Sequence, residues 1–136
     1  MNSLFVSTDK GLLNKRLIID FLHGTHWAKN FSDERILKSI EHSFCFGLFE
    51  DREQVGFARV VTDFTYSAWI GDVFVVKEKQ KQGYGKVLLN AILNHDSLKD
   101  IIKWRLSTED AHSFYSKFGF TAVREPNRLM EKIISG

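Results

Sequence analysis

The stretch that most constrains this chain is DVFVVKEKQKQGYGKVLLNAIL, residues 72–93. An apolar run typical of a buried strand ends in the polar segment QKQGYG, and a helical spacing of apolar residues follows at 88, 89, 92 and 93. The first N–H groups of a helix lack intrahelical partners, and the helix dipole favours anions there. Gly83 and Gly85 have no side chains, so the backbone can approach a phosphate closely. The stretch therefore predicts a strand, a diphosphate-binding loop and a helix in succession.

Two common phosphate-binding motifs do not fit this loop. The dinucleotide pattern G-x-G-x-x-G fails because Leu88 stands at the third glycine position, and a P-loop would need a glycine at position 80 and Ser or Thr at position 87. The pattern that does fit is Gln-x-x-Gly-x-Gly, formed by Gln80, Gly83 and Gly85. A pair of glycines between a strand and a helix can also be no more than a tight turn. The loop alone leaves both interpretations open.

The rest of the chain has the pattern of a mixed α/β (α+β) domain, with helices packed on a mostly antiparallel sheet. Apolar spacing predicts helices over 14–24, 32–43, 84–93 and 109–120, and strands over 4–7, 44–50, 54–62, 68–76 and 101–108. Ser32 is a candidate N-cap, and Gly119 suits the left-handed position after the last helix. Two further segments, 120–123 and 128–134, are expected to close the chain as a hairpin. The expected sheet has six to seven strands, flanked by about four helices.

Size and composition bound the function. The chain has 136 residues, which fits a single domain over residues 1–136. A balance of 19 basic against 17 acidic residues gives no reason to expect nucleic acid or a membrane surface as a partner. No apolar run approaches the length of a membrane span, and no secretory signal is visible, so we expect a cytoplasmic location. Cys45, the one cysteine, excludes an internal disulfide and is expected to be a small buried strand residue.

Together these motifs resemble the GNAT superfamily of N-acetyltransferases. The segment VFVVKEKQKQGYGKVLL is similar to that family's central strand, acyl-CoA loop and following helix, and DAHSFYSKFGF is similar to its later helix. The resemblance implies a GNAT-type fold, acetyl-CoA as co-substrate and no metal. It also implies transfer of the acetyl group to a primary amine by direct attack in a ternary complex.

The resemblance assigns the acyl-CoA site to particular residues. The pantetheine arm would lie against the backbone of Val73, Phe74 and Val75, since an exposed strand edge can pair with an amide-containing chain. The diphosphate would meet the loop, and the residues implied there are Gln80, Lys81, Gln82, Gly83, Tyr84, Gly85 and Lys86. Val73 to Val75 can pack into the core at the same time, because the backbone binds while the side chains pack.

Two residues are candidates for catalysis. Tyr115 matches the family's frequent general acid, which would protonate the departing thiolate; its other interpretation is a core residue in a stripe with Phe114 and Phe118. Asp72 is a candidate base, although strand alternation points it away from the family's usual position unless a bulge turns it. A water chain could serve in its place. His112 and Thr108 are expected to have solvated or structural roles.

The acceptor cannot be identified from the sequence. The bulky loop HGTHWAKNF and the second and third strands suggest a pocket wall, with His26, Trp27, Phe31, Arg59 and Asp63 as candidates. Small amines and peptide amines both remain open as partners, and a homodimer is possible because small members of the superfamily are often dimers. Two other functions also stay open: a catalytically silent acyl-CoA-binding or sensor domain, and a nucleotide-phosphate binder.

Overall fold

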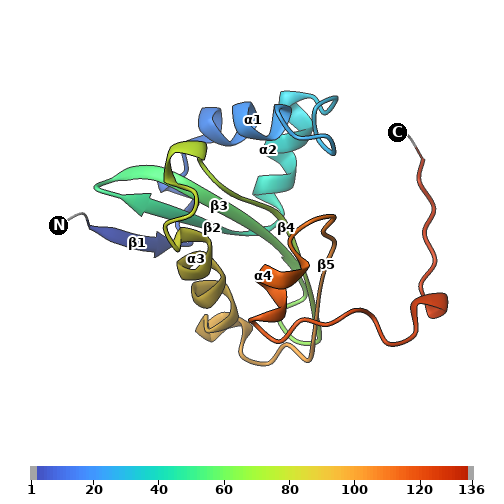
Figure 1. The fold of residues 1–136 in the computed structure, drawn as a ribbon. Coiled ribbons are helices and arrows are strands. Elements are labelled where there is room, and N and C mark those ends of the chain that lie inside the picture. Colours follow the sequence, from blue (N-terminus) through green and yellow to red (C-terminus); the bar gives the residue numbers. More distant parts are fainter. Residues whose placement is uncertain (1–2, 135–136) are drawn as a thin grey trace.

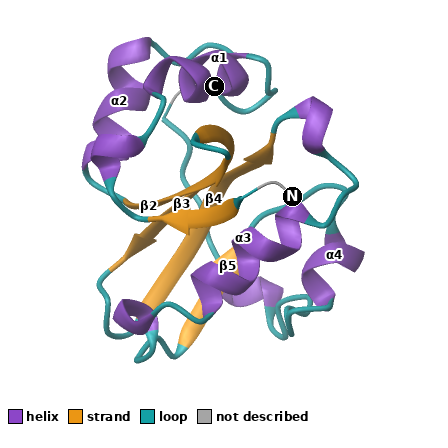
Figure 2. Cartoon of the chain, turned by 90° about the vertical axis from the view of Figure 1, so that its left-hand side faces the viewer, coloured by secondary structure: helices purple, strands orange, loops and turns teal. Residues whose placement is uncertain are grey.

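A computed structural model describes residues 3–134. In it, helices cover both faces of one sheet (Figures 1 and 2). In chain order the elements are β1 (Leu4–Ser7), α1 (Lys15–His23), α2 (Asp33–Glu41), β2 (Phe44–Glu50), β3 (Glu53–Thr62), β4 (Ser67–Val75), α3 (Tyr84–Leu93), β5 (Lys103–Leu106) and α4 (His112–Ser116). None of the helices within this described part of the chain is long and apolar enough to cross a membrane.

The sheet follows chain order, β1-β2-β3-β4-β5. Neighbours pair antiparallel except β4 and β5, which run parallel. Asp51 and Arg52 make the turn between β2 and β3 with positive φ angles of 51° and 75°, as a two-residue hairpin of the mirror-image type requires. The pairing of β4 with β5 covers Ser67–Ile70 and goes no further along β4.

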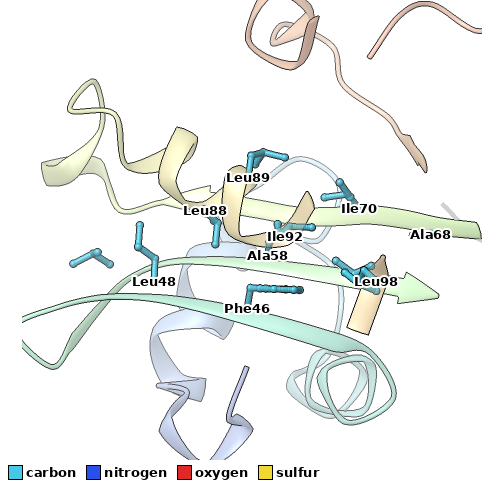
Figure 3. Close-up of a cluster of buried hydrophobic side chains, with 11 residues drawn as sticks. Phe46, Leu48, Ala58, Ala68, Ile70, Leu88, Leu89, Ile92 and Leu98 are labelled. Atoms are coloured by element: carbon cyan, nitrogen blue, oxygen red, sulfur yellow. The ribbon is translucent and has the colours of Figure 1, made fainter. Parts of the chain in front are cut away.

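Each face of the sheet has its own apolar core. Leu88, Leu89 and Ile92 of α3 are fully buried against Phe46, Ala58 and other residues of the middle strands (Figure 3). On the opposite face α1 and α2 bury Ile18, Leu22, Ile36 and Ile40 against the sheet, where Phe21 stacks on Phe74 with ring centroids 4.0 Å apart. Burial of such side chains stabilises a domain by about 1.5–3 kcal/mol each, so α3 and the α1–α2 pair fix the sheet from both sides.

The helix ends agree with the sequence prediction. The Ser32 side chain accepts a hydrogen bond from the Arg35 N–H and caps α2. After α4, Gly119 has φ +93°, and the N–H groups of Gly119 and Phe120 donate to the carbonyls of Ser116 and Tyr115. This pair of bonds is the Schellman arrangement that a glycine after the helix favours. It folds Phe120 back toward Tyr115, with ring centroids 6.0 Å apart.

The expected final hairpin is wrong, and the sheet has five strands rather than six to seven. Residues 121–134 form no strand; apart from a single turn of 3-10 helix at Pro126–Arg128 they run extended away from the domain (Figure 1). A strand needs a neighbour for its N–H and C=O groups, and this segment has none within residues 3–134. Two other predicted elements are shorter than expected: β5 covers 103–106 and α4 covers 112–116.

Candidate active site

The glycine loop holds a row of backbone donors at the start of α3. Gly83 is the N-cap with φ +84°, and Lys81 is also left-handed with φ +64°. The first helical bond runs from the Val87 N–H to the Gly83 carbonyl. Within residues 3–134, the N–H groups of residues 81–86 donate to no other group. Such a run of unpaired N–H groups at a helix N-terminus is an anion-binding arrangement.

The charge and shape of the loop suit an anion. Lysines stand at positions 77, 79, 81 and 86, against the single acidic residue Glu78. A Cβ built on Gly83 would meet no atom within 4 Å, so the space beside it is open. The Gln80 side chain donates to the Val75 carbonyl over 2.8 Å and ties the loop to the end of β4. The loop is therefore open on its outer side and anchored on its inner side.

Beyond Ile70, β4 has no neighbour on the side of β5 among the described residues. Its other edge continues to pair with β3, up to Gly56 opposite Val75. Val73 is half-buried toward the α3 core and Phe74 is buried toward the α1–α2 core, so the side chains pack on both faces. What remains open is the backbone edge of residues 72–75, apart from the Val75 carbonyl that accepts from Gln80, and this edge ends at the glycine loop.

Helix α4 lies against the start of α3, beside this edge (Figures 1 and 2). The ring of Phe114 would lie 3.4 Å from a Cβ on Gly85, which joins the two predicted motifs in space. Tyr115 is half-buried, and burial raises the pKa of its phenol above the ordinary value of 10.0. Its hydroxyl has no hydrogen-bond partner within the described residues. A protonated phenol without an internal partner can donate a proton or a hydrogen bond to a ligand.

A β-bulge turns Asp72 to the face of the sheet that carries Arg59. Arg59 pairs with Gly71 and Phe57 pairs with Phe74, so β4 has one more residue than β3 between the two pairs. Asp72 adopts φ +53°, which non-glycine residues seldom do. Its Oδ2 accepts from Arg59 Nε over 2.8 Å. Strand alternation alone would have placed this carboxylate on the other face.

Asp72 connects β4 to the loop after α1. The Trp27 indole N–H donates to Asp72 Oδ1 over 2.8 Å, and Arg59 also donates from a terminal nitrogen to the Ser43 hydroxyl over 3.1 Å. The ring of His26 stands edge-on to Trp27, with centroids 5.3 Å apart. The Asp72 side chain is 12% exposed and that of Arg59 is 23% exposed, so the pair is shielded but not sealed from solvent. Four of the predicted residues, His26, Trp27, Arg59 and Asp72, thus lie together.

The remaining candidates lie apart from this group. Asp63 accepts from the N–H groups of Thr65, Tyr66 and Ser67, which holds the turn before β4 and lowers the pKa of its carboxyl. Phe31 is exposed beneath the guanidinium of Arg35. His112 is exposed at the start of α4, and Thr108 accepts from the Ala111 N–H as a local cap. Cys45 is buried, and burial raises its pKa to about 11, which confirms the expected structural role.

A buried carboxylate under the loop was missed by the sequence prediction. Glu50, at the end of β2, forms an ion pair with Lys79 over 2.6 Å and accepts a hydrogen bond from the Tyr84 hydroxyl. These contacts raise the pKa of Lys79 and of Tyr84, chiefly through their hydrogen bonds to Glu50. Glu50 therefore holds both ends of the glycine loop. An acidic residue at the end of the apolar run SFCFGLF was the one available signal.

The fold and this geometry agree with the comparison with known families. Residues 41–122 match the family model described as "Acetyltransferase (GNAT) domain". The chain belongs to the GNAT acetyltransferase family, and the match spans β2, the bulge, the glycine loop and α4. This membership supports acyl transfer as the general activity.

Individual relatives agree with the assignment. A candidate acetyltransferase of the GNAT family from Xanthomonas campestris pv. campestris is 41% identical in sequence, with 97% of this chain and 94% of that chain covered and a TM-score of 0.93. A candidate acetyltransferase of Gibberella zeae is 27% identical, with 88% of this chain and 80% of the relative covered. A predicted acetyltransferase from Clostridium acetobutylicum, solved with acetyl-CoA, has a TM-score of 0.68 at 12% identity over 98% of this chain and 97% of that chain, which shows the shared fold alone.

Proposed function

We propose that this protein is an N-acetyltransferase that transfers the acetyl group of acetyl-CoA to a primary amine. The observations that carry the proposal are three features: unpaired N–H groups over residues 81–86, the open backbone edge of residues 72–75, and a phenol, Tyr115, on the helix whose Phe114 lies against Gly85. Each feature matches one part of an acyl-CoA thioester. The diphosphate needs donors, the pantetheine needs backbone partners, and the sulfur needs a proton as it leaves.

The N–H groups of the loop would bind the diphosphate, with Lys81 and Lys86 adding charge. The pantetheine amides would pair with the edge of β4 as an added strand does. This assignment uses the backbone of Val73, Phe74 and Val75 and leaves their packed side chains in place. The relative from Clostridium acetobutylicum, whose fold is similar, was solved with acetyl-CoA, which supports the choice of ligand.

The chemical step would be direct attack of a neutral amine on the thioester carbonyl. The C–N bond forms, the C–S bond breaks, and the thiolate takes a proton from the Tyr115 hydroxyl. The amine loses its own proton to water, and solvent restores the phenol. The phenol of Tyr115 is protonated at neutral pH. Burial raises its pKa and makes it a weaker acid than a free tyrosine, so the proton would have to move as the C–S bond breaks. General acids of this kind typically contribute about 10²–10⁴-fold to rate.

We assign Asp72 to the acceptor side of the thioester. Its two oxygens already accept hydrogen bonds from Trp27 and Arg59, so the carboxylate is held in one orientation. Held there, it would attract and orient an incoming amine, while a water molecule carries the amine's proton away. His26 and Trp27 would line the approach to it.

The direct experiment measures thiol release from acetyl-CoA in the presence of a panel of amines: polyamines, amino acids, aminoglycosides and peptides with free amino groups. At least one amine should raise thiol release above hydrolysis, with an acetylated product of matching mass. Saturable binding of acetyl-CoA without turnover on any acceptor would favour the second candidate, a catalytically silent acyl-CoA sensor. Thermal protection by ATP but not by CoA would contradict both.

A further inference from the structure

The last described segment, residues 121–134, is an exposed arm that carries several large apolar side chains. We call it the C-terminal arm. All of its residues are exposed, and five are large and apolar: Val123, Leu129, Met130, Ile133 and Ile134, with exposures from 46% to 97%. Its two backbone hydrogen bonds within residues 3–134 are local and close one turn, from Arg128 to Glu125 and from Leu129 to Pro126. Apolar side chains concentrated on one extended segment indicate a surface that is covered in the working protein.

The domain offers an unpaired strand edge close to the root of this arm. β5 is the last strand of the sheet, and only β4 pairs with it among the described residues. An unpaired edge is a ready template for another strand. Ile102, just before β5, is 75% exposed. The sheet therefore ends on a free edge beside exposed apolar surface.

A hollow of about 1010 Å³ lies along this edge. Its walls include Trp104 of β5, Leu93 of α3, and Phe118 and Phe120 at the end of α4. The root of the arm, residues 121–125 with Arg128 and Leu129, forms another wall. No residue of the glycine loop or of the Asp72 group contributes to it. The hollow is thus separate from the proposed acyl-CoA site.

We propose that the C-terminal arm of one copy pairs with the β5 edge of a second copy, and that the two copies exchange arms in a two-fold dimer. The arm's segment RLMEKII, in which four of seven residues are large and apolar, can form a strand, yet it forms none alone. Its root already lines the hollow of its own chain, while residues 130–134 continue away from the domain (Figure 1). In a reciprocal exchange each arm pairs with the β5 edge of the other copy, so no arm and no β5 edge is left over and the assembly closes at two copies.

Light scattering after size exclusion tests the exchange. The full chain should elute as a dimer of twice 15.7 kDa, and a monomer would overturn the proposal. Replacing Ile133 and Ile134 together by Asp should give a folded monomer, because charges cannot enter an apolar strand interface. The matched control is Leu12→Asp, an apolar residue that is 51% exposed outside the arm, and it should stay dimeric. A dimer that survives the arm variant would also overturn the proposal.

Cross-linking separates exchange from an arm that folds back on its own domain. Two tagged chains, one with Lys103→Cys on β5 and one with Met130→Cys on the arm, are co-expressed and treated with a short bis-maleimide. Exchange predicts a cross-linked species that carries both tags. In the double variant on one chain, a cross-linked species of monomer mass would show the arm on its own β5 edge and contradict exchange. Cys45 is buried and protonated, so it should not react.

Discussion

The outer half of β4 presents mainly backbone groups on the side toward β5 and mainly side chains on the other side. On the β5 side, the free edge and the glycine loop present backbone groups, and their positions follow from strand, turn and helix geometry. On the other side, a bulge presents the side chains of Asp72, Arg59 and Trp27, which come from three separate segments. A backbone-built site tolerates sequence change, whereas a side-chain-built site changes with each substitution.

The largest effect is expected at Tyr115, the proposed general acid. Tyr115→Phe keeps the ring and its packing but removes the proton, so kcat should fall by about 10²–10⁴-fold with little change in acetyl-CoA affinity. Steady-state kinetics and calorimetry measure the two quantities separately. Undiminished turnover would remove Tyr115 as the acid.

The pH dependence tests the same assignment. Burial raises the pKa of Tyr115 above 10.0, so the phenol stays protonated through neutral and mildly alkaline pH. The wild-type rate should therefore rise from pH 7 to about 10, as more of the acceptor amine becomes neutral. A rate that already decreases with rising pH before pH 9 is reached would contradict a protonated Tyr115 as the donor.

A matched pair of glycine variants tests the backbone-built side. Gly83 has φ +84°, where a side chain costs about 1–2 kcal/mol, so Gly83→Ala should weaken CoA binding roughly tenfold by distorting the loop. Gly85 lies within the helix, and its new Cβ would make ordinary contact with Phe114 at 3.4 Å. Gly85→Ala should therefore weaken binding less. Equal losses of CoA affinity in the two variants would indicate that the left-handed conformation at Gly83 does not determine CoA binding.

Asp72→Asn and Trp27→Phe test the side-chain-built side, with smaller expected effects. Asp72→Asn keeps the side-chain shape and removes a charge, whereas Trp27→Phe keeps an aromatic ring and removes the indole N–H donor. The KM for the acceptor should rise several-fold, whereas the dissociation constant for acetyl-CoA should stay the same. Because the Arg59–Asp72 pair is shielded, Asp72→Asn should also destabilise the fold by about 1–3 kcal/mol, measured by urea unfolding. A change in acetyl-CoA affinity alone would reverse the assignment of the two sides.

The sequence correctly predicted the features that depend on residues close together in the chain. The strand–loop–helix around Gly83, the cap at Ser32 and the left-handed Gly119 follow from residues within a few positions of one another, and each is confirmed. The location of the core also followed from apolar spacing. Leu88, Leu89 and Ile92 are buried as expected.

What the sequence could not predict depends on distant contacts. The bond between Trp27 and Asp72 joins residues 45 positions apart, and the bulge that permits it has no local signal. Glu50 reaches Tyr84 across 34 positions. The wrong prediction of a final hairpin has a related cause. A strand-like pattern indicates that a segment can pair, but it does not identify the strand edge with which the segment pairs. If the arms are exchanged, that edge belongs to another molecule.

The most direct test of the account compares the binding of coenzyme A with that of pantetheine, which lacks the diphosphate, by isothermal titration calorimetry. If the N–H groups of residues 81–86 hold the diphosphate, coenzyme A should bind at least tenfold more tightly, and Gly83→Ala should reduce that advantage. Equal affinity for the two compounds, or no heat with either in well-folded protein, would contradict the central claim.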